Sequence, residues 1–287
     1  IGSESKCLRV DFVDDKLEKK NKFVFGFPGR TTEYLPAIAV EKIMTETDPA
    51  MISVREVALK TLDEKMRTDA ETRIKYASKY ASVANYWKKW IGEVEGLKKS
   101  DAVSKKKNYE QYLIAKNAQI KPTIDELNRL YTEQSPYNLN KAYYSEVLRN
   151  AESLTLANNY YNFVKAVESG KMDAKTADNF KARLSGIYKD YDAVLDAKVT
   201  AKLLALYANK TPKQFLPAGF EQYKDENQNL KTIEELSKNS VITGRGALNG
   251  ATTYSDINKV FADQNALVQN LKKDPLMKLF STLREHY

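Results

Sequence analysis

The sequence predicts a mainly α protein: a multi-helix domain with long antiparallel helices, preceded by a short N-terminal β-hairpin. Three observations predict this class. Apolar residues alternate with other residues only within about the first thirty positions, and alternation is the period of a strand. Beyond them apolar residues follow helical spacing, and the prolines leave residues 50–121 and 137–211 uninterrupted. With 287 residues, the chain is also long enough to bury a core without disulfide or metal staples.

The predicted hairpin joins two alternating segments. Leu8-Arg9-Val10-Asp11-Phe12 forms the first and Phe23-Val24-Phe25-Gly26-Phe27 the second, with a charged connection over residues 14–21. Because an isolated hairpin is only marginally stable in water, we expect it to belong to a sheet whose other strands lie outside the chain. We therefore assign residues 1–35 to the hairpin and its following turn, and residues 36–287 to a helical domain.

The longest predicted helix begins at Ser53 and keeps helical spacing until Gly92, a length of about 58 Å at 1.5 Å a residue. Its start has the capping-box pattern Ser53-x-x-Glu56, and the same pattern at Thr123 and Thr232 predicts further helix starts. The remaining helices are predicted over residues 98–120, 123–134, 141–169, 173–209, 255–272 and 276–285. We expect breaks at Gly92 to Gly96, Lys121-Pro122, Ser135-Pro136, Gly170 and Gly219.

The composition excludes several kinds of chemistry. The formal net charge is +8, and Cys7 and His286 are the only cysteine and the only histidine. One sulfur cannot form a disulfide framework or a thiolate metal cluster, and one imidazole cannot build a histidine zinc site. A Ser-His or Cys-His pair would depend on a residue at the chain end. We therefore predict no metal site and no cofactor, and no membrane span, since no apolar run reaches the required length.

The helical stretch from Ile74 to Trp90 places a polar residue among apolar ones. At 100° a residue, Asn85 falls within about 20° of Ile74, and so on the apolar stripe rather than on the solvated face. A buried amide needs hydrogen-bond partners. The small residues Ala77 and Ala81 leave room for another helix or for a ligand. The pattern alone favours, by a modest margin, an Asn bonded across a helix–helix contact.

Three blocks of sequence occur in a fixed order: Gly26-Phe27-Pro28-Gly29-Arg30-Thr31, then Asp48-Pro49-Ala50-Met51-Ile52, then residues 73–88, which end in Asn85-Tyr86-Trp87-Lys88. In order and spacing they resemble serine peptidase family 46, the bacterial dipeptidyl peptidases 7 and 11. The resemblance implies a chymotrypsin-like double β-barrel with a large helical domain inserted over the active-site cleft. Residues 1–35 would then belong to the barrel portion and residues 36–287 to the helical cap.

The resemblance also implies a function. Members of the family release dipeptides from peptide N-termini with a Ser-His-Asp triad, which would lie on flanking β-barrel domains of the same parent chain. No catalytic residue is then expected in this chain, which alone should be inactive. A family Asn that binds the substrate ammonium group corresponds to Asn85, and Tyr86 and Trp87 would wall the same pocket. An ammonium group taken out of water needs such oxygen acceptors. The implied location is the periplasm or the cell surface.

A different class of function stays open: a non-enzymatic, basic helical module that acts as an interaction or scaffold protein. Short lysine runs such as Lys105-Lys106-Lys107 are explained more simply as solvated helix faces, so we expect no nucleic-acid partner. Binding to DNA that weakens log-linearly with salt would favour this alternative. The side-chain preference at the cleavage site and the oligomeric state, including a homodimer, are not determined by the sequence.

Overall fold

The computed structural model describes residues 34–243 and 254–285. The chain divides into two compact units, Ile1–Pro36 and Ala37–Tyr287. Almost all of the first unit lies outside the described residues, so the fold is that of the second unit. The assignment of these parts of the chain to a barrel portion and an inserted cap stays a prediction.

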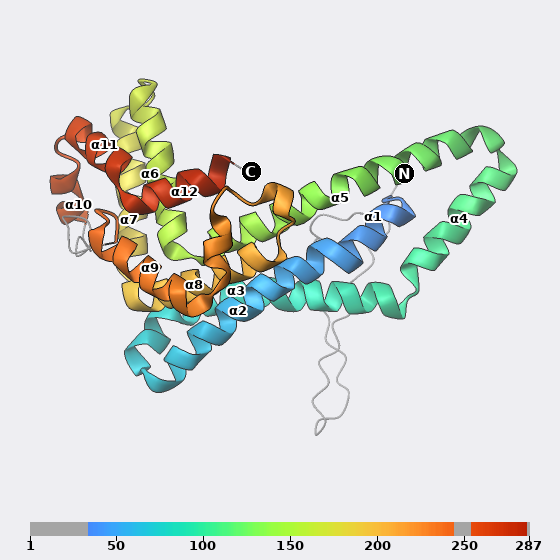
Figure 1. Cartoon of the computed structure of the whole chain (residues 1–287), viewed down its shortest axis with the longest axis horizontal. Helices are drawn as coiled ribbons and strands as arrows, with labels where there is room; N and C mark the ends of the chain where they lie inside the picture. Colours follow the sequence, from blue (N-terminus) through green and yellow to red (C-terminus); the bar gives the residue numbers. More distant parts are fainter. Residues whose placement is uncertain (1–33, 244–253, 286–287) are drawn as a thin grey trace, which may run out of the picture. The chain divides into compact units, whose positions relative to one another are not determined.

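The second unit is a succession of helices (Figure 1). Its described α-helices are α1 (Ala37–Lys42), α2 (Asp48–Thr68), α3 (Ala70–Lys99), α4 (Ala102–Lys116), α5 (Lys121–Asn150), α6 (Glu152–Glu168), α7 (Ala174–Tyr188), α8 (Ala193–Lys210), α9 (Glu226–Asn239), α10 (Tyr254–Val260), α11 (Gln264–Lys273) and α12 (Pro275–Glu285). A π-helical turn, Ile43–Thr47, joins α1 to α2, and short 3-10 helices occur at Ala118–Ile120, Lys213–Phe215 and Phe220–Lys224. Helices α2 and α3 pack against each other, as do α8 and α9 (Figure 1).

The predicted fold class is right in being mainly α and wrong in including a β-hairpin. Residues 34–243 and 254–285 contain helices, turns and coil but no strand. The segments that we expected to pair, 8–12 and 23–27, lie outside the described residues. A two-residue period forms a strand only where a partner strand completes the hydrogen bonds, and the described part of the chain offers none. The fold is therefore all-α wherever the structure describes it.

The long helix predicted over residues 53–92 is in fact two helices. Helix α2 begins earlier, at Asp48, and α3 begins at Ala70, because Asp69 has an extended conformation that interrupts the helix. The Asp69 carboxylate accepts hydrogen bonds from two backbone N–H groups in the first turn of α3, at 3.0 and 3.3 Å. The chain reverses at this cap, so α2 and α3 pack as antiparallel partners.

The other boundaries follow the predicted ones in part. Helix α6 ends just before Gly170, whose φ of +66° is the left-handed conformation that glycine adopts at helix ends. Gly219 also has a positive φ, +79°, and ends the connection after α8. In contrast, α3 continues through Gly92 and Gly96, and α5 continues through Pro136. Packing on neighbouring helices outweighs the local cost of these residues.

The capping residues also differ from the predicted ones. Ser53, Thr123 and Thr232 lie inside α2, α5 and α9 and do not cap them. The break at Lys121-Pro122 is confirmed, because α5 begins there with the proline in its first turn. The described α-helices that are capped by the side chain of the residue just before them use aspartate for this purpose: Asp69, Asp173, Asp192, Asp225, Asp263 and Asp274.

The core consists of two hydrophobic clusters. The first lies mainly among α2, α5 and α8 and includes the fully buried Val54 and Leu203. The second is rich in aromatic rings and includes Phe163 of α6 and Phe280 of α12. Helix α6 contributes to both, because Leu154 at its start belongs to the first cluster. This helix therefore connects the two halves of the core.

Candidate functional site

Helix α3 carries the residues that the sequence predicts to bind substrate, but its buried face is not the predicted one. Tyr76, Val83 and Trp90 recur every seven residues and point into the protein, with exposed fractions of 2%, 7% and 8%. Ile74, which defines the predicted apolar stripe, is 78% exposed, and Asn85 is exposed as well. The expectation that Asn85 lies on a buried stripe is therefore wrong. The aromatic stripe is the buried one because it removes more apolar surface from water.

Asn85 and Trp87 are not among the residues that line the groove beside Tyr86. Successive helical residues point about 100° apart, so three in a row spread over about 200°. Tyr86 lines a groove. Ser78, about two helical turns before Asn85, lines the same groove, and the two side chains leave the helix axis in directions that differ by about 20°. Trp87 is partly buried, and its indole Nε1 has no hydrogen-bond partner among the described residues. The binding roles of all three stay predictions.

The groove beside Tyr86, which we name the α3 groove, has a volume of about 430 Å³. It lies between α2 and α3, the junction of α5 with α6, and the end of α7. Its lining includes four basic residues, two acidic residues, an amide and two aromatic rings: Arg55, Lys75, Lys79, Arg149, Glu152, Asp190, Asn150, Tyr76 and Tyr86. Charged groups of both signs therefore meet an aromatic ring in a space large enough for a short peptide segment.

A buried ion pair lies beneath the α3 groove. Arg55 of α2 and Glu146 of α5 are 2% and 4% exposed. Arg55 Nε donates to Glu146 Oε2 at 2.6 Å, and Nη2 donates to Oε1 at 3.3 Å. Asn150 Nδ2 also donates to Glu146 Oε2, at 3.3 Å, so the carboxylate is satisfied from two sides. Such pairing is the condition under which a protein tolerates buried charges.

Glu152 supplies the acidic part of the groove. Tyr76 Oη donates to Glu152 Oε2 at 2.8 Å and accepts a hydrogen bond from the backbone N–H of Asp192 at 2.9 Å. Lys79 Nζ lies 3.0 Å from the same carboxylate oxygen. Burial raises the pKa of Glu152; the neighbouring Lys79 opposes this rise, and the Asp196 carboxylate adds to it. This network fixes the start of α6 against α3 and the start of α8.

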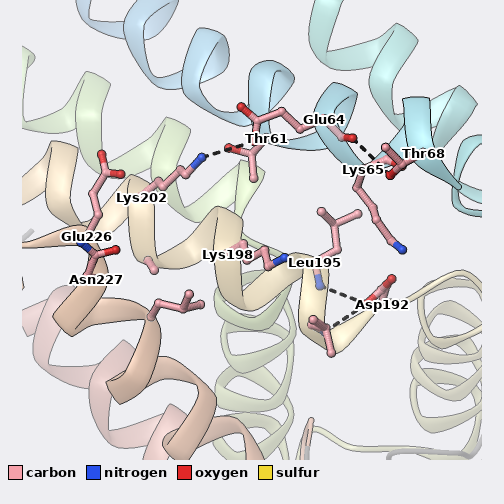
Figure 2. A pocket seen from close by; sticks show the side chains of 13 residues that line it. Thr61, Glu64, Lys65, Thr68, Asp192, Leu195, Lys198, Lys202, Glu226 and Asn227 are labelled. Carbon is pink, nitrogen blue, oxygen red and sulfur yellow. Dashed lines mark hydrogen bonds and ion pairs between the residues drawn. The ribbon is translucent and has the colours of Figure 1, made fainter.

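A second cavity, of about 550 Å³, lies between α2, α8 and α9 (Figure 2). Its charged lining residues are largely engaged within the protein: Lys202 Nζ lies 3.7 Å from a Glu64 oxygen, and Lys65 Nζ lies 2.8 Å from an Asp69 oxygen. Asp192 is engaged as well, because its carboxylate caps the first turn of α8. None of the residues predicted to bind substrate lines this cavity, so the α3 groove is the better candidate site.

Asp48, in the second of the three sequence blocks, is a buried carboxyl at the start of α2. It is 4% exposed, and its Oδ2 has no hydrogen-bond partner among the described residues. Burial raises the pKa of Asp48 to about 7; the Glu93 carboxylate adds to the rise, and Lys89 opposes it. We therefore expect Asp48 to titrate near neutral pH.

Arg55, Glu146 and Glu152 are the site residues that sequence reasoning missed. Arg55 and Glu146 directly adjoin Val54 and Val147 of the core, where a charge would be buried and must be paired. That pattern could have indicated a buried ion pair. It could not have identified the partners, because Arg55 and Glu146 are 91 positions apart.

Comparison with known proteins decides the family. The model of the family Peptidase S46 matches residues 15–287. The chain belongs to the peptidase S46 family. The resemblance seen in the three sequence blocks is thereby confirmed.

Relatives of this S46 chain include two proteins named Asp/Glu-specific dipeptidyl-peptidase. That of Flavobacterium psychrophilum is 44% identical over 71% of this chain and 30% of its own length. That of Capnocytophaga gingivalis is 38% identical over 81% of this chain and 33% of its own length. A dipeptidyl-peptidase 7 of Porphyromonas endodontalis is 30% identical over 90% of this chain and 31% of its own length. The S46 chain thus spans about a third of the length of these curated relatives.

A solved structure shares the fold. The crystal structure of Porphyromonas endodontalis DPP11 in complex with the dipeptide Arg-Glu has a TM-score of 0.67 and 17% identity, and the match covers 91% of this chain and 37% of that chain. Among the described residues of the S46 chain, no helix has the length and apolar character needed to cross a membrane. The same residues form no group of three or more His, Cys, Asp or Glu side chains suited to a metal ion.

Proposed function

We propose that this S46 chain is the helical, substrate-binding part of a serine dipeptidyl peptidase that removes dipeptides from peptide N-termini. The observation that carries the proposal is the 44% identity to a relative named for dipeptidyl-peptidase activity. Relatives at 38% and 30% identity carry names of the same activity. The physical reading of the sequence is consistent with this, since its helical domain has a polar groove beside the predicted binding residues.

The proposal places the Ser-His-Asp triad outside the 287 residues, on flanking β-barrel domains of the parent protein. Two facts support this division. The chain spans about a third of the length of its relatives. A triad of this kind needs a histidine as its base, and the 287 residues contain a single one, His286. The proposed location of the parent protein is the periplasm or the cell surface, on the family resemblance alone.

Within this function, Asn85 would bind the free ammonium group of the peptide, and the α3 groove would receive its first residues. Two properties support these roles. The side chain of Asn85 is exposed, so its amide oxygen is accessible to a ligand. Glu152 and Asn150 add oxygen acceptors in the adjoining groove, which a charged ammonium group needs when it leaves water.

The proposed preference is for acidic residues before the cleaved bond. The supporting observation is that the relatives at 44% and 38% identity are named Asp/Glu-specific, whereas the relative at 30% is named dipeptidyl-peptidase 7. Two dye-linked dipeptides that differ only in an acidic or an aliphatic second residue would measure this preference. Faster release from the aliphatic substrate would contradict it.

The function itself is tested by comparing the 287-residue chain with the full-length parent protein. Both are incubated with a dye-linked dipeptide that has a free N-terminus, and dye release is recorded. We expect turnover by the full-length protein and none by the chain. Turnover by the chain alone would refute the placement of the triad, and no turnover by the full-length protein would refute the dipeptidyl peptidase activity.

The role of Asn85 is tested in the full-length protein. Asn85→Ala should lower kcat/KM about 100-fold, because the ammonium group loses a charge-assisted hydrogen bond. Asn108→Ala, which changes an exposed Asn on α4, is the matched control and should leave kcat/KM unchanged. Equal kinetics of the Asn85→Ala variant and the wild type would remove Asn85 from the substrate site.

A further inference from the structure

Arg55 connects the buried ion pair to the aromatic wall of the α3 groove. Its Nη1 donates to the backbone carbonyl oxygen of Val83 in α3 at 3.1 Å, while Nε and Nη2 bind Glu146 in α5. The central carbon of the guanidinium lies over two rings of α3. Its Cζ lies 5.2 Å from the centroid of the Tyr86 ring and 4.8 Å from that of Trp90. One buried side chain of α2 thus contacts α5, the α3 backbone and two aromatic side chains of α3.

Tyr86 is the part of this arrangement that a ligand in the groove would meet. It is 45% exposed and lines the groove. A tyrosine on a helix surface ordinarily exchanges between rotamers. Here the guanidinium attracts the electron-rich face of the ring, and the Trp90 ring lies 5.7 Å away at an interplanar angle of 50°. These contacts restrict the orientation of the Tyr86 ring.

We propose that Arg55 is a positioning residue for peptide binding. Held by Glu146, its guanidinium fixes the Tyr86 ring as a wall of the α3 groove, against which the first residues of a peptide lie. The inference rests on the proposed function, because it takes a peptide as the ligand of the groove. Lysine cannot replace Arg55 here. A guanidinium group has a planar surface that stacks on aromatic rings and several N–H donors that can bind Val83 and Glu146 at the same time, and an ammonium group has neither.

Kinetics of the full-length protein test the coupling between Arg55 and Tyr86. Arg55→Lys and Tyr86→Ala should each raise KM for a dye-linked dipeptide about tenfold, with kcat changed less than about twofold. The double variant should be no worse than either single variant, because both substitutions remove the same wall. Increases in KM that multiply in the double variant would overturn the inference, since a merely structural role of Arg55 predicts independent effects.

A control variant tests whether any loss of an Arg–Tyr contact has this effect. The Arg284 guanidinium of α12 lies 4.5 Å from the centroid of the Tyr161 ring, and neither residue lines the α3 groove. Arg284→Lys should therefore leave KM unchanged. A rise in KM equal to that of Arg55→Lys would show that the effect is not specific to the groove and would overturn the inference.

Fluorescence of the 287-residue chain separates this inference from the proposed function. Trp87 and Trp90 are its only tryptophans, so Trp87→Phe leaves Trp90, beside Arg55, as the reporter. A tripeptide with a free N-terminus should shift the Trp90 emission, and either Arg55→Lys or Tyr86→Ala, added to Trp87→Phe, should abolish the shift. The N-acetylated tripeptide is the control and should have no effect.

The outcomes are distinguishable. The positioning role is overturned if the tripeptide does not shift the Trp90 emission of the Trp87→Phe chain. It is also overturned if the shift persists after Arg55→Lys and after Tyr86→Ala. Both conclusions hold even when the full-length protein releases dipeptides. Absence of dipeptide release by the full-length protein refutes the proposed function without reference to Trp90. If circular dichroism shows that Arg55→Lys does not fold, Tyr86→Ala alone decides, because its half-exposed side chain can be removed without unfolding α3.

Discussion

Asp48 lies at the first position of α2, with a side chain that is 4% exposed and one carboxylate oxygen without a partner among the described residues. Burial raises the pKa of this carboxyl from 3.8 to about 7. Between these values the folded chain holds a proton that the unfolded chain has released. The contribution of Asp48 to the free energy of unfolding is therefore fully present below about pH 4 and is lost as the pH rises to about 7. The loss amounts to roughly 4 kcal/mol.

Asp48→Asn should remove this pH dependence, because an amide does not titrate. The free energy of unfolding of the variant, relative to wild type, should rise between pH 4 and pH 8 by up to roughly 4 kcal/mol. Urea denaturation of both proteins at several pH values in this range measures the difference. Glu56→Gln, at an exposed acid of the same helix, is the matched control and should show no such trend. A constant difference between Asp48→Asn and wild type would show that Asp48 titrates normally.

At the residue scale, the predicted substrate-binding residues led to the α3 groove, and their binding roles stay predictions. The block around Asn85 lies beside the α3 groove, and Tyr86 lines it. The direction in which Asn85 points was wrong, because α3 has two stripes with helical spacing and the helix buries the aromatic one. Arg55 and Glu152 could not be predicted as groove residues, since only the packing of α2 and α6 on α3 brings them there.

The helix caps show which local signals predict element boundaries. Six described α-helices begin after an aspartate whose carboxylate accepts hydrogen bonds from N–H groups of the first turn. The predicted Ser and Thr boxes lie inside helices, because a capping pattern also occurs by chance on a helix surface. Pro136 shows that a helix-breaking residue is not decisive either. It lies inside α5, because packing by the rest of that helix compensates for one missing hydrogen bond.

Asp192 offers a test of this type of cap. Its carboxylate accepts hydrogen bonds from the backbone N–H groups of Val194 and Leu195, both at 3.0 Å. Asp192→Ala should therefore lower the free energy of unfolding by about 1 kcal/mol, the typical cost of a lost N-cap. Asp190→Ala, at an exposed aspartate two positions earlier, removes the same charge without removing a cap and should have a smaller effect. Equal losses in urea denaturation would show that charge, and not capping, is what Asp192 contributes.

At the scale of the whole molecule, the sequence was sufficient to predict a mainly α fold. It was not sufficient to predict that the core consists of two hydrophobic clusters. Helical spacing after the first thirty or so residues, with few prolines, was sufficient to predict a mainly α unit. The predicted hairpin required partner strands that the described residues do not contain. The two hydrophobic clusters could not be separated in advance, because residues of one helix, such as Leu154 and Phe163 of α6, belong to different clusters.

This sharing of α6 predicts that the two clusters unfold together. Phe163 is 1% exposed, and its ring centroid lies 5.2 Å from that of Phe180 and 5.1 Å from that of Phe261 in the second cluster. Phe163→Ala should lower the free energy of unfolding by about 3–5 kcal/mol. Because α6 also packs in the first cluster, the loss should be felt by α3, which carries both tryptophans.

Two probes measured on the same samples decide whether this coupling exists. Far-UV circular dichroism reports all helices, whereas tryptophan fluorescence reports α3 alone. In Phe163→Ala both midpoints in urea should fall together, by about 1 M. Ile74→Ala, at a side chain that is 78% exposed, should move neither. The fluorescence midpoint could instead stay in place while part of the dichroism signal is lost at lower urea concentration. That result would mean that the two clusters unfold separately and that α3, with its groove, is stable without the aromatic cluster.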